Sequence, residues 1–105
     1  MKTVTVAEFS RFPGPRFKKL GPHSGEEFRD DVLLVELASN DEVQVDLDGV
    51  FGYGSSFLEE AFGGLVRKGV SKNKLKFLMD NLKSEDDPSL IEEIIEYIQD
   101  AQRGS

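Results

Sequence analysis

The stretch Val45-Asp-Leu-Asp-Gly-Val-Phe-Gly-Tyr-Gly-Ser-Ser-Phe-Leu58 decides the fold that we expect for this chain. It continues an alternation of apolar and polar side chains that begins at Val43 and is typical of a β-strand. The glycines that follow predict a turn. Ser56 and Glu59 have the spacing of a capping box, which predicts that a helix begins here. The segment therefore predicts a strand that leads through a glycine turn into a helix.

Regular patterns also lie on both sides of this segment. Residues 2–9 alternate in the same way and predict a first strand, and residues 74–79 predict a third. Ser24 and Glu27 form another capping box, which predicts a helix over residues 25–39. The helix that begins near Ser56 is expected to end at Lys68, before Gly69. After Asp87-Pro88, a last helix with a stripe of leucine and isoleucine is expected to end near Gln102.

Residues 11–23 interrupt these patterns with three prolines and two glycines, so they predict a long basic loop. The expected order is then β-loop-α-β-α-β-α, in a single domain of residues 1–105. Helical crossovers favour a parallel sheet, so we expect an α/β fold of two or three layers with mainly parallel strands and three helices. Binding sites gather at the carboxyl ends of parallel strands. The basic loop and the turn at residues 49–54 should meet there.

The composition limits the chemistry that is open to this chain. It has no cysteine and one histidine, which excludes disulfides, thiolate zinc sites, a cysteine nucleophile and multi-histidine metal sites. We expect no cofactor. No apolar run has the length of a signal peptide or a membrane span, so we expect a cytoplasmic protein without membrane contact. The net charge of −7 disfavours binding to the negatively charged backbone of nucleic acids, so we do not expect a nucleic-acid partner.

The segment 45–58 resembles the core signature of STAS domains, the fold of the anti-anti-sigma factors. In that signature a strand ending in Asp-Leu-x-Gly-Val leads to Asp-Ser-Ser-Gly-Leu at a helix start. Gly54 and Phe57 stand where the signature has Asp and Gly. The matching residues in this chain are Asp46, Leu47, Gly49, Val50, Ser55, Ser56 and Leu58.

Three further segments are similar to a narrower group, the STAS-like domain family of uncharacterised function. They are Glu59-Glu-Ala-Phe-Gly-Gly-Leu65, Pro13-Gly-Pro-Arg16 and Gly21-Pro-His-Ser-Gly-Glu-Glu-Phe-Arg29. The resemblance covers about residues 10–100 and implies the STAS-like α/β fold.

The resemblance also implies a regulatory binding module that is not an enzyme. In anti-anti-sigma factors the second serine of the pair is phosphorylated by a partner of the histidine-kinase-type ATPase fold, which is also the anti-sigma factor. Carried over by position, the acceptor would be Ser56, with Ser55 beside it. A phosphate there would meet the positive end of the helix and add up to about −2 charge to a docking surface. The simpler interpretation makes Ser56 a structural cap.

The basic loop suggests an alternative function. Arg16 could hold an anion near the serine turn, because a fixed guanidinium group binds phosphate or carboxylate well. The candidate residues for partner or anion binding are Arg16, His23, Ser24, Glu27, Arg29, Gly54 and Phe57. The alternative is thus a small nucleotide- or anion-binding protein or enzyme, and an RNA-binding module is a third hypothesis. Capping and surface ion pairs are the simpler interpretation of the same residues.

Overall fold

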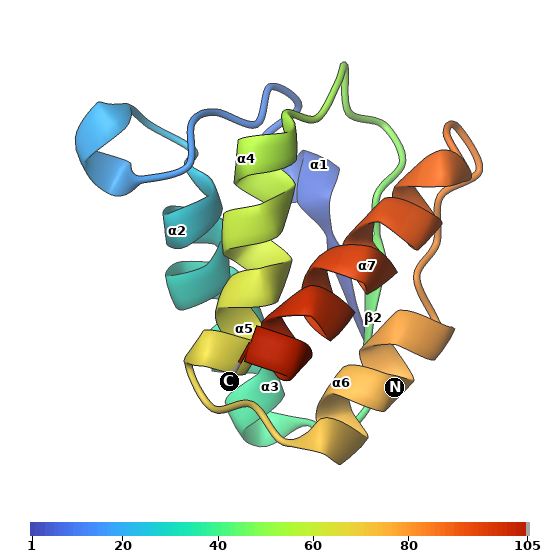
Figure 1. The fold of residues 1–105 in the computed structure, drawn as a ribbon. Coiled ribbons are helices and arrows are strands. Elements are labelled where there is room, and N and C mark those ends of the chain that lie inside the picture. The colour runs from blue at the N-terminus through green and yellow to red at the C-terminus, as the bar shows by residue number, and fades with distance from the viewer. Residues whose placement is uncertain (105) are drawn as a thin grey trace.

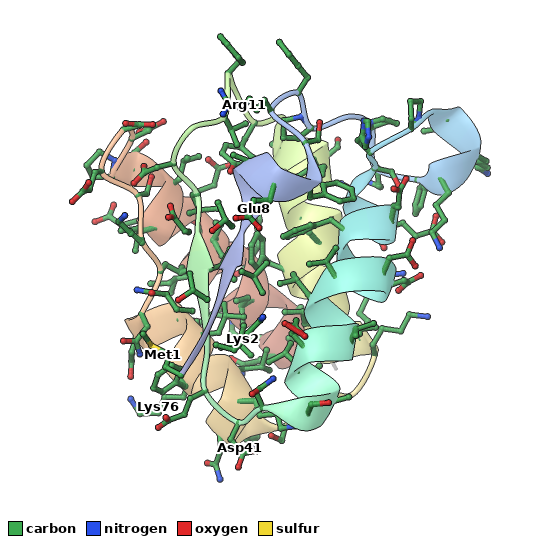
Figure 2. All side chains as sticks on the ribbon, turned by 180° about the vertical axis from the view of Figure 1, so that it is seen from behind. Met1, Lys2, Glu8, Arg11, Asp41 and Lys76 are labelled. Carbon is green, nitrogen blue, oxygen red and sulfur yellow. The ribbon has the colours of Figure 1, made fainter. Side chains whose placement is uncertain are left out.

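Alternating apolar residues place one face of a small sheet against the helices. The computed structural model describes residues 1–104. In it β1 (Lys2–Thr5) and β2 (Val43–Asp46) pair in parallel, with Val4 opposite Val45. Val4 and both valines of β2 are buried, while Thr3, which precedes Val4 and faces the other side of the sheet, is exposed. The helices therefore cover one face of the sheet, as the opposite views of Figures 1 and 2 show.

The first predicted crossover helix is confirmed as one continuous helical segment. It consists of α2 (Gly25–Phe28), the π-helical turn η2 (Arg29–Leu33) and α3 (Leu34–Ser39). Its start is the predicted one. The Ser24 hydroxyl caps the helix by accepting a hydrogen bond from the Glu27 amide at 3.0 Å.

The second predicted crossover helix has the same construction. It consists of α4 (Ser55–Leu58), the π-helical turn η3 (Glu59–Gly63) and α5 (Gly64–Arg67). It ends where Gly69 takes a φ of 83°, a conformation that favours glycine. Residues 45–58 thus fold as expected, from strand through turn to helix.

The predicted third strand at residues 74–79 is wrong, because that segment forms α6 (Lys72–Asp80). The Ser71 hydroxyl caps the helix at the Lys74 amide, and Leu75 and Leu78 are both buried on one helical face. A short apolar run is compatible with the period of a strand or of a helix, and here the helical period places Leu75 and Leu78 together in the core. The expected topology of three strands and three helices is therefore not reproduced. A single parallel bridge from Lys83 to Asp46 stands where a third strand would lie.

Two smaller corrections concern the amino-terminal part. The first strand ends at Thr5 rather than at residue 9, because the alternation stops and α1 (Val6–Phe9) turns away from the sheet. The basic loop contains one short 3₁₀ turn, η1 (Lys18–Leu20).

The last helix closes the helical layer. Asp87 accepts a hydrogen bond from the Ser89 amide, which confirms the predicted start of α7 (Ser89–Gly104), and the helix runs slightly beyond the expected end. Ile94 and Ile98 are fully buried, and α7 packs across η3 and α5 (Figure 1). None of the helices in residues 1–104 combines the length and the apolar character needed to cross a membrane.

Candidate functional site

The basic loop and the glycine turn meet beyond the carboxyl ends of the two strands, as predicted. The Phe51 amide donates a hydrogen bond to the Arg11 carbonyl at 2.9 Å. The rings of Phe12 and Phe51 stack with centroids 4.7 Å apart and an interplanar angle of 2°. These two side chains are 69% and 74% exposed, and Arg11 marks this end of the molecule in Figure 2.

We call this end of the molecule the sheet-end surface. It consists of Phe12, Phe51, Gly54, Ser55 and Ser56, all of them exposed. Its five residues come from two loops and one helix start, so no continuous segment of the chain forms it.

Tyr53 holds the glycine turn in place. Its hydroxyl donates a hydrogen bond to the Leu47 carbonyl at 2.8 Å, and its ring lies 6.2 Å from that of Phe57. Burial raises the pKa of Tyr53 above its ordinary value, with help from Asp46 and Asp48, so the phenol stays neutral and can donate. The turn that carries Phe51 is therefore anchored to the residue that follows β2 and to α4.

The serine pair lies inside the first turn of α4 and does not cap it. Gly54 occupies the cap position in an extended conformation, and no side chain caps the helix. The predicted capping box of Ser56 and Glu59 is therefore wrong: the cap position is at Gly54, two residues before Ser56, so Ser56 lies inside the helix. Ser56 is exposed, and within residues 1–104 its hydroxyl has no hydrogen-bond partner. Phe57, the next residue, is fully buried.

Ser55 differs from Ser56 in having a neighbour on α7, since its side chain lies close enough to the Tyr97 phenol to act on the pKa of that phenol. The phenol also donates to Glu93 at 2.7 Å, and this bond, followed by burial, raises the pKa of Tyr97 to about 12. Of the two candidate acceptors, Ser56 is thus the one with a free hydroxyl.

Arg16 does reach the helix that follows the serine pair, but it binds carboxylates there. It lies 2.5 Å from Glu59 and 3.3 Å from Glu60. Glu60 also accepts a hydrogen bond from Arg29, and Glu59 accepts one from Arg67 at 2.8 Å. The structure therefore brings the candidates Arg16 and Arg29 together through Glu60, and their charges are balanced within the chain.

The environment favours the ionised forms of Glu59, Asp30 and Arg29. The hydrogen bond from Arg67, aided by Arg16, holds the pKa of Glu59 below its ordinary value against the effect of burial. The hydrogen bond from Arg29 lowers the pKa of Asp30 in the same way. Burial would lower the pKa of Arg29, but its bonds to Asp30 and Glu60 raise it. The network ties the basic loop to η2 and η3.

Ser24, Glu27 and His23 have structural contacts at the start of α2. The Glu27 carboxylate accepts a hydrogen bond from the His23 amide at 3.1 Å, not from the Ser24 amide as the capping box predicted. This occurs because His23 takes a φ of 58°, which turns its amide toward the helix. The amides of Gly25 and Glu26 donate to carbonyls of the loop, so the first turn of α2 has no free amide for an anion.

Sequence reasoning missed two parts of this arrangement. It named the loop and the helix start but did not pair Phe12 with Phe51, and it treated Glu59 as a cap. The available signal was an aromatic residue near the tip of each loop, since both loops were expected at one end of the sheet.

Comparison with known proteins agrees with the resemblance seen in the sequence. Residues 24–87, more than half of the chain, match the model of a family described as a STAS-like domain of unknown function (DUF4325). No curated protein and no solved structure matches the chain. The matched region includes the serine pair and Phe51, while Phe12 and Arg16 precede it.

Proposed function

Because this chain belongs to the family of STAS-like domains of unknown function, we propose that it is a regulatory domain that binds a partner protein and is not an enzyme. The proposed docking site is the sheet-end surface. The observation that carries the proposal is that this end of the molecule exposes both the Phe12–Phe51 stack and the Ser55–Ser56 pair, which begins four residues after Phe51.

The stacked rings have the properties of an interface anchor. Large exposed aromatic groups are costly in water, and aromatic residues supply much of the binding energy in protein interfaces. Here the two rings stack on each other, and the loops that carry them are held by the Phe51–Arg11 and Tyr53–Leu47 hydrogen bonds. Such a surface loses little conformational freedom when it binds.

Ser56 is the proposed switch within this surface. By resemblance, the partner is an ATPase of the histidine-kinase type that is also a kinase for this domain. It would transfer the γ-phosphoryl group of ATP to the Ser56 oxygen. The bond to the β-phosphate oxygen breaks, ADP leaves, and the hydroxyl proton passes to the medium. The added charge of roughly −1.5 to −2 would lie beside the aromatic anchor and weaken docking.

The test compares binding of this partner class by the wild-type chain and by charge variants. Ser56→Asp should reduce capture of a histidine-kinase-type ATPase by about tenfold or more, whereas Ser56→Ala should retain it. Ser71→Asp is a matched control, because Ser71 is an exposed serine at the start of a different helix, and Asp caps as well as Ser does. Incubation of purified partner, chain and ATP should place phosphate on Ser56. Equal binding by Ser56→Asp and wild type, with no phosphate on Ser56, would contradict the proposal.

The contacts of Arg16 and Arg29 give the alternative function less support. An anion-binding site needs free positive charge, and both guanidinium groups are paired with glutamates. Calorimetric titration with inorganic phosphate and with ATP tests this alternative directly, and binding that is lost in Arg16→Ala would favour it over partner docking.

A further inference from the structure

Strand β1 has one open edge. Within residues 1–104 the sheet contains only β1 and β2, so the other side of β1 pairs with no strand. The Lys2 amide donates to the Glu42 carbonyl at 2.9 Å, and in a parallel ladder alternate residues bond to the partner strand. Lys2 and Val4 therefore bond toward β2, and the amides of Thr3 and Thr5 point to the open side.

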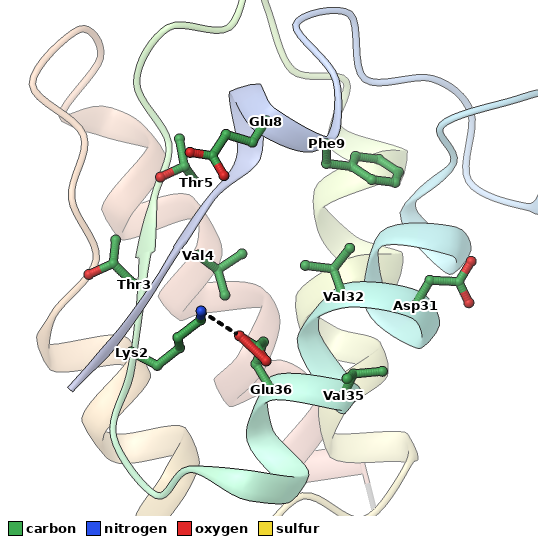
Figure 3. Close-up of a pocket in the computed structure, with 10 residues that line it drawn as sticks. All are labelled: Lys2, Thr3, Val4, Thr5, Glu8, Phe9, Asp31, Val32, Val35 and Glu36. Carbon is green, nitrogen blue, oxygen red and sulfur yellow. Dashed lines mark ion pairs between the residues drawn. The ribbon is translucent and has the colours of Figure 1, made fainter.

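A groove of about 320 Å³ runs between this edge and the helical segment η2–α3 (Figure 3). Its apolar lining comes from both sides, with Val4 and Phe9 on one side and Val32 and Val35 on the other. Val4 and Val32 point toward one another in Figure 3. Val35 is 56% exposed, one of the few large apolar side chains of the described residues that is not covered.

The charged residues of the groove are mostly acidic. Glu8, Asp31 and Glu36 line it together with a single basic residue, Lys2. Lys2 is already paired with Glu36 at 3.2 Å, and Asp31 has only the distant Lys18 at 3.9 Å. Glu8 forms no ion pair among residues 1–104. The groove therefore presents negative charge next to an apolar lining.

We propose that this groove binds an extended segment of a partner protein, which adds to the sheet as a strand beside β1. Backbone groups of the segment would bond to Thr3 and Thr5. Because side chains alternate along a strand, every second one would face Val4, Val32 and Val35, and these positions take valine or isoleucine. The remaining positions take lysine or arginine, which reach Glu8 and Asp31.

This surface is separate from the one in the proposed function. Sheet edges in proteins are commonly protected by proline or bulges, and β1 has no proline at residues 2–5 and pairs with β2 in an unbroken register. The groove runs along the side of the sheet, whereas the sheet-end surface lies beyond its strands (Figure 2). A failure of one proposal therefore leaves the other untouched, and Ser56→Asp should not change binding in the groove.

The test uses a fluorescent peptide of alternating valine and lysine, with an equally long peptide of alternating valine and glutamate as the charge control. Fluorescence polarisation should show at least about tenfold tighter binding of the lysine peptide. In heteronuclear NMR spectra the amides of Thr3 and Thr5 should shift and become protected from exchange when this peptide is added.

Variants then locate the binding. Thr3→Pro removes an outward amide, which an edge position tolerates, and should weaken binding by about tenfold. Glu8→Lys should weaken it similarly, whereas Glu96→Lys makes the same charge change at an exposed position on α7 and should have no effect. Val35→Lys should weaken it and Phe51→Lys should not.

Equal binding of the two peptides, or binding that is unchanged in Thr3→Pro with the fold intact by circular dichroism, would overturn the proposal. Sedimentation velocity of the chain without peptide provides the last check. A dimer that Thr3→Pro abolishes would assign the edge to a second copy of this chain instead of a partner segment.

Discussion

Phe12 and Phe51 stack face to face with their ring centroids 4.7 Å apart, although one follows β1 and the other follows β2. The stack exists because parallel strands end at the same edge of a sheet, so the loops that leave them meet. It joins the basic loop to the turn before the serine pair, and it leaves both rings in contact with water.

Phe12→Ala and Phe51→Ala should weaken partner binding by at least about tenfold, because each removes half of the proposed anchor. The free energy of unfolding should change by no more than about 1 kcal/mol, since both side chains are mostly exposed. Binding measurements and chemical denaturation separate the two effects. Leu20→Ala is the control, because Leu20 is equally exposed and lies outside the sheet-end surface. If the folded Phe12→Ala and Phe51→Ala variants bound the partner as tightly as the wild type, the assignment of these two rings as the anchor would be wrong.

Glu60→Gln should destabilise the fold by about 3 kcal/mol, because it removes a negative charge that is paired with the buried Arg29 guanidinium group. Arg29 cannot move away easily, since a β-carbon at Gly64 would already lie 2.8 Å from its side chain. Glu59→Gln makes the same change at a more exposed carboxylate and should cost no more than about 1 kcal/mol. Urea denaturation measures both. Equal losses in the two variants would show that the burial of Glu60 is not the cause.

The fold should lose stability in acid, in part through Glu59. Its pKa is lowered in the folded state from an ordinary value of 4.5, so the unfolded chain binds the proton more tightly. Its stabilising effect is therefore complete above pH 4.5 and disappears as the pH falls through the lower folded-state value. The free energy of unfolding of Glu59→Gln should fall less steeply than that of the wild type in this range. Glu96→Gln, at a residue outside every ion pair of residues 1–104, should retain the wild-type slope.

Gly25→Ala should destabilise the chain by about 2 kcal/mol, because the helices α2 and α4 approach closely at this residue. A β-carbon on Gly25 would lie 2.5 Å from the Phe57 carbonyl oxygen. Gly54→Ala is the matched substitution, since nothing lies within 4 Å of a β-carbon there, and it should cost only about 0.5 kcal/mol through the weaker cap. Thermal unfolding of the two variants checks the difference. A Gly25→Ala variant as stable as Gly54→Ala would mean that the two helices can separate without cost.

The sequence by itself determined the two crossover segments and the turn between β2 and α4. These features depend on local information: the Ser24 cap, the alternation along residues 43–47 and the glycines near residue 54 act over a few residues. The loop at residues 11–23 was predictable for the same reason, since its prolines exclude regular structure. The same local signals placed the loop and the turn at one end of the sheet. They predict helical crossovers, which favour parallel strands, and the loops that follow parallel strands lie at the same end.

Only the tertiary structure decided whether residues 74–79 form a strand or a helix, and which partners Arg16 and Phe12 have. The segment that became α6 suits both periods, so burial of Leu75 and Leu78 against the rest of the core settled its form. Arg16 binds Glu59 and Glu60, and Phe12 stacks on Phe51, across long separations in the chain. The physical reason is that a charge or a ring has many candidate partners in the sequence, and packing alone selects among them.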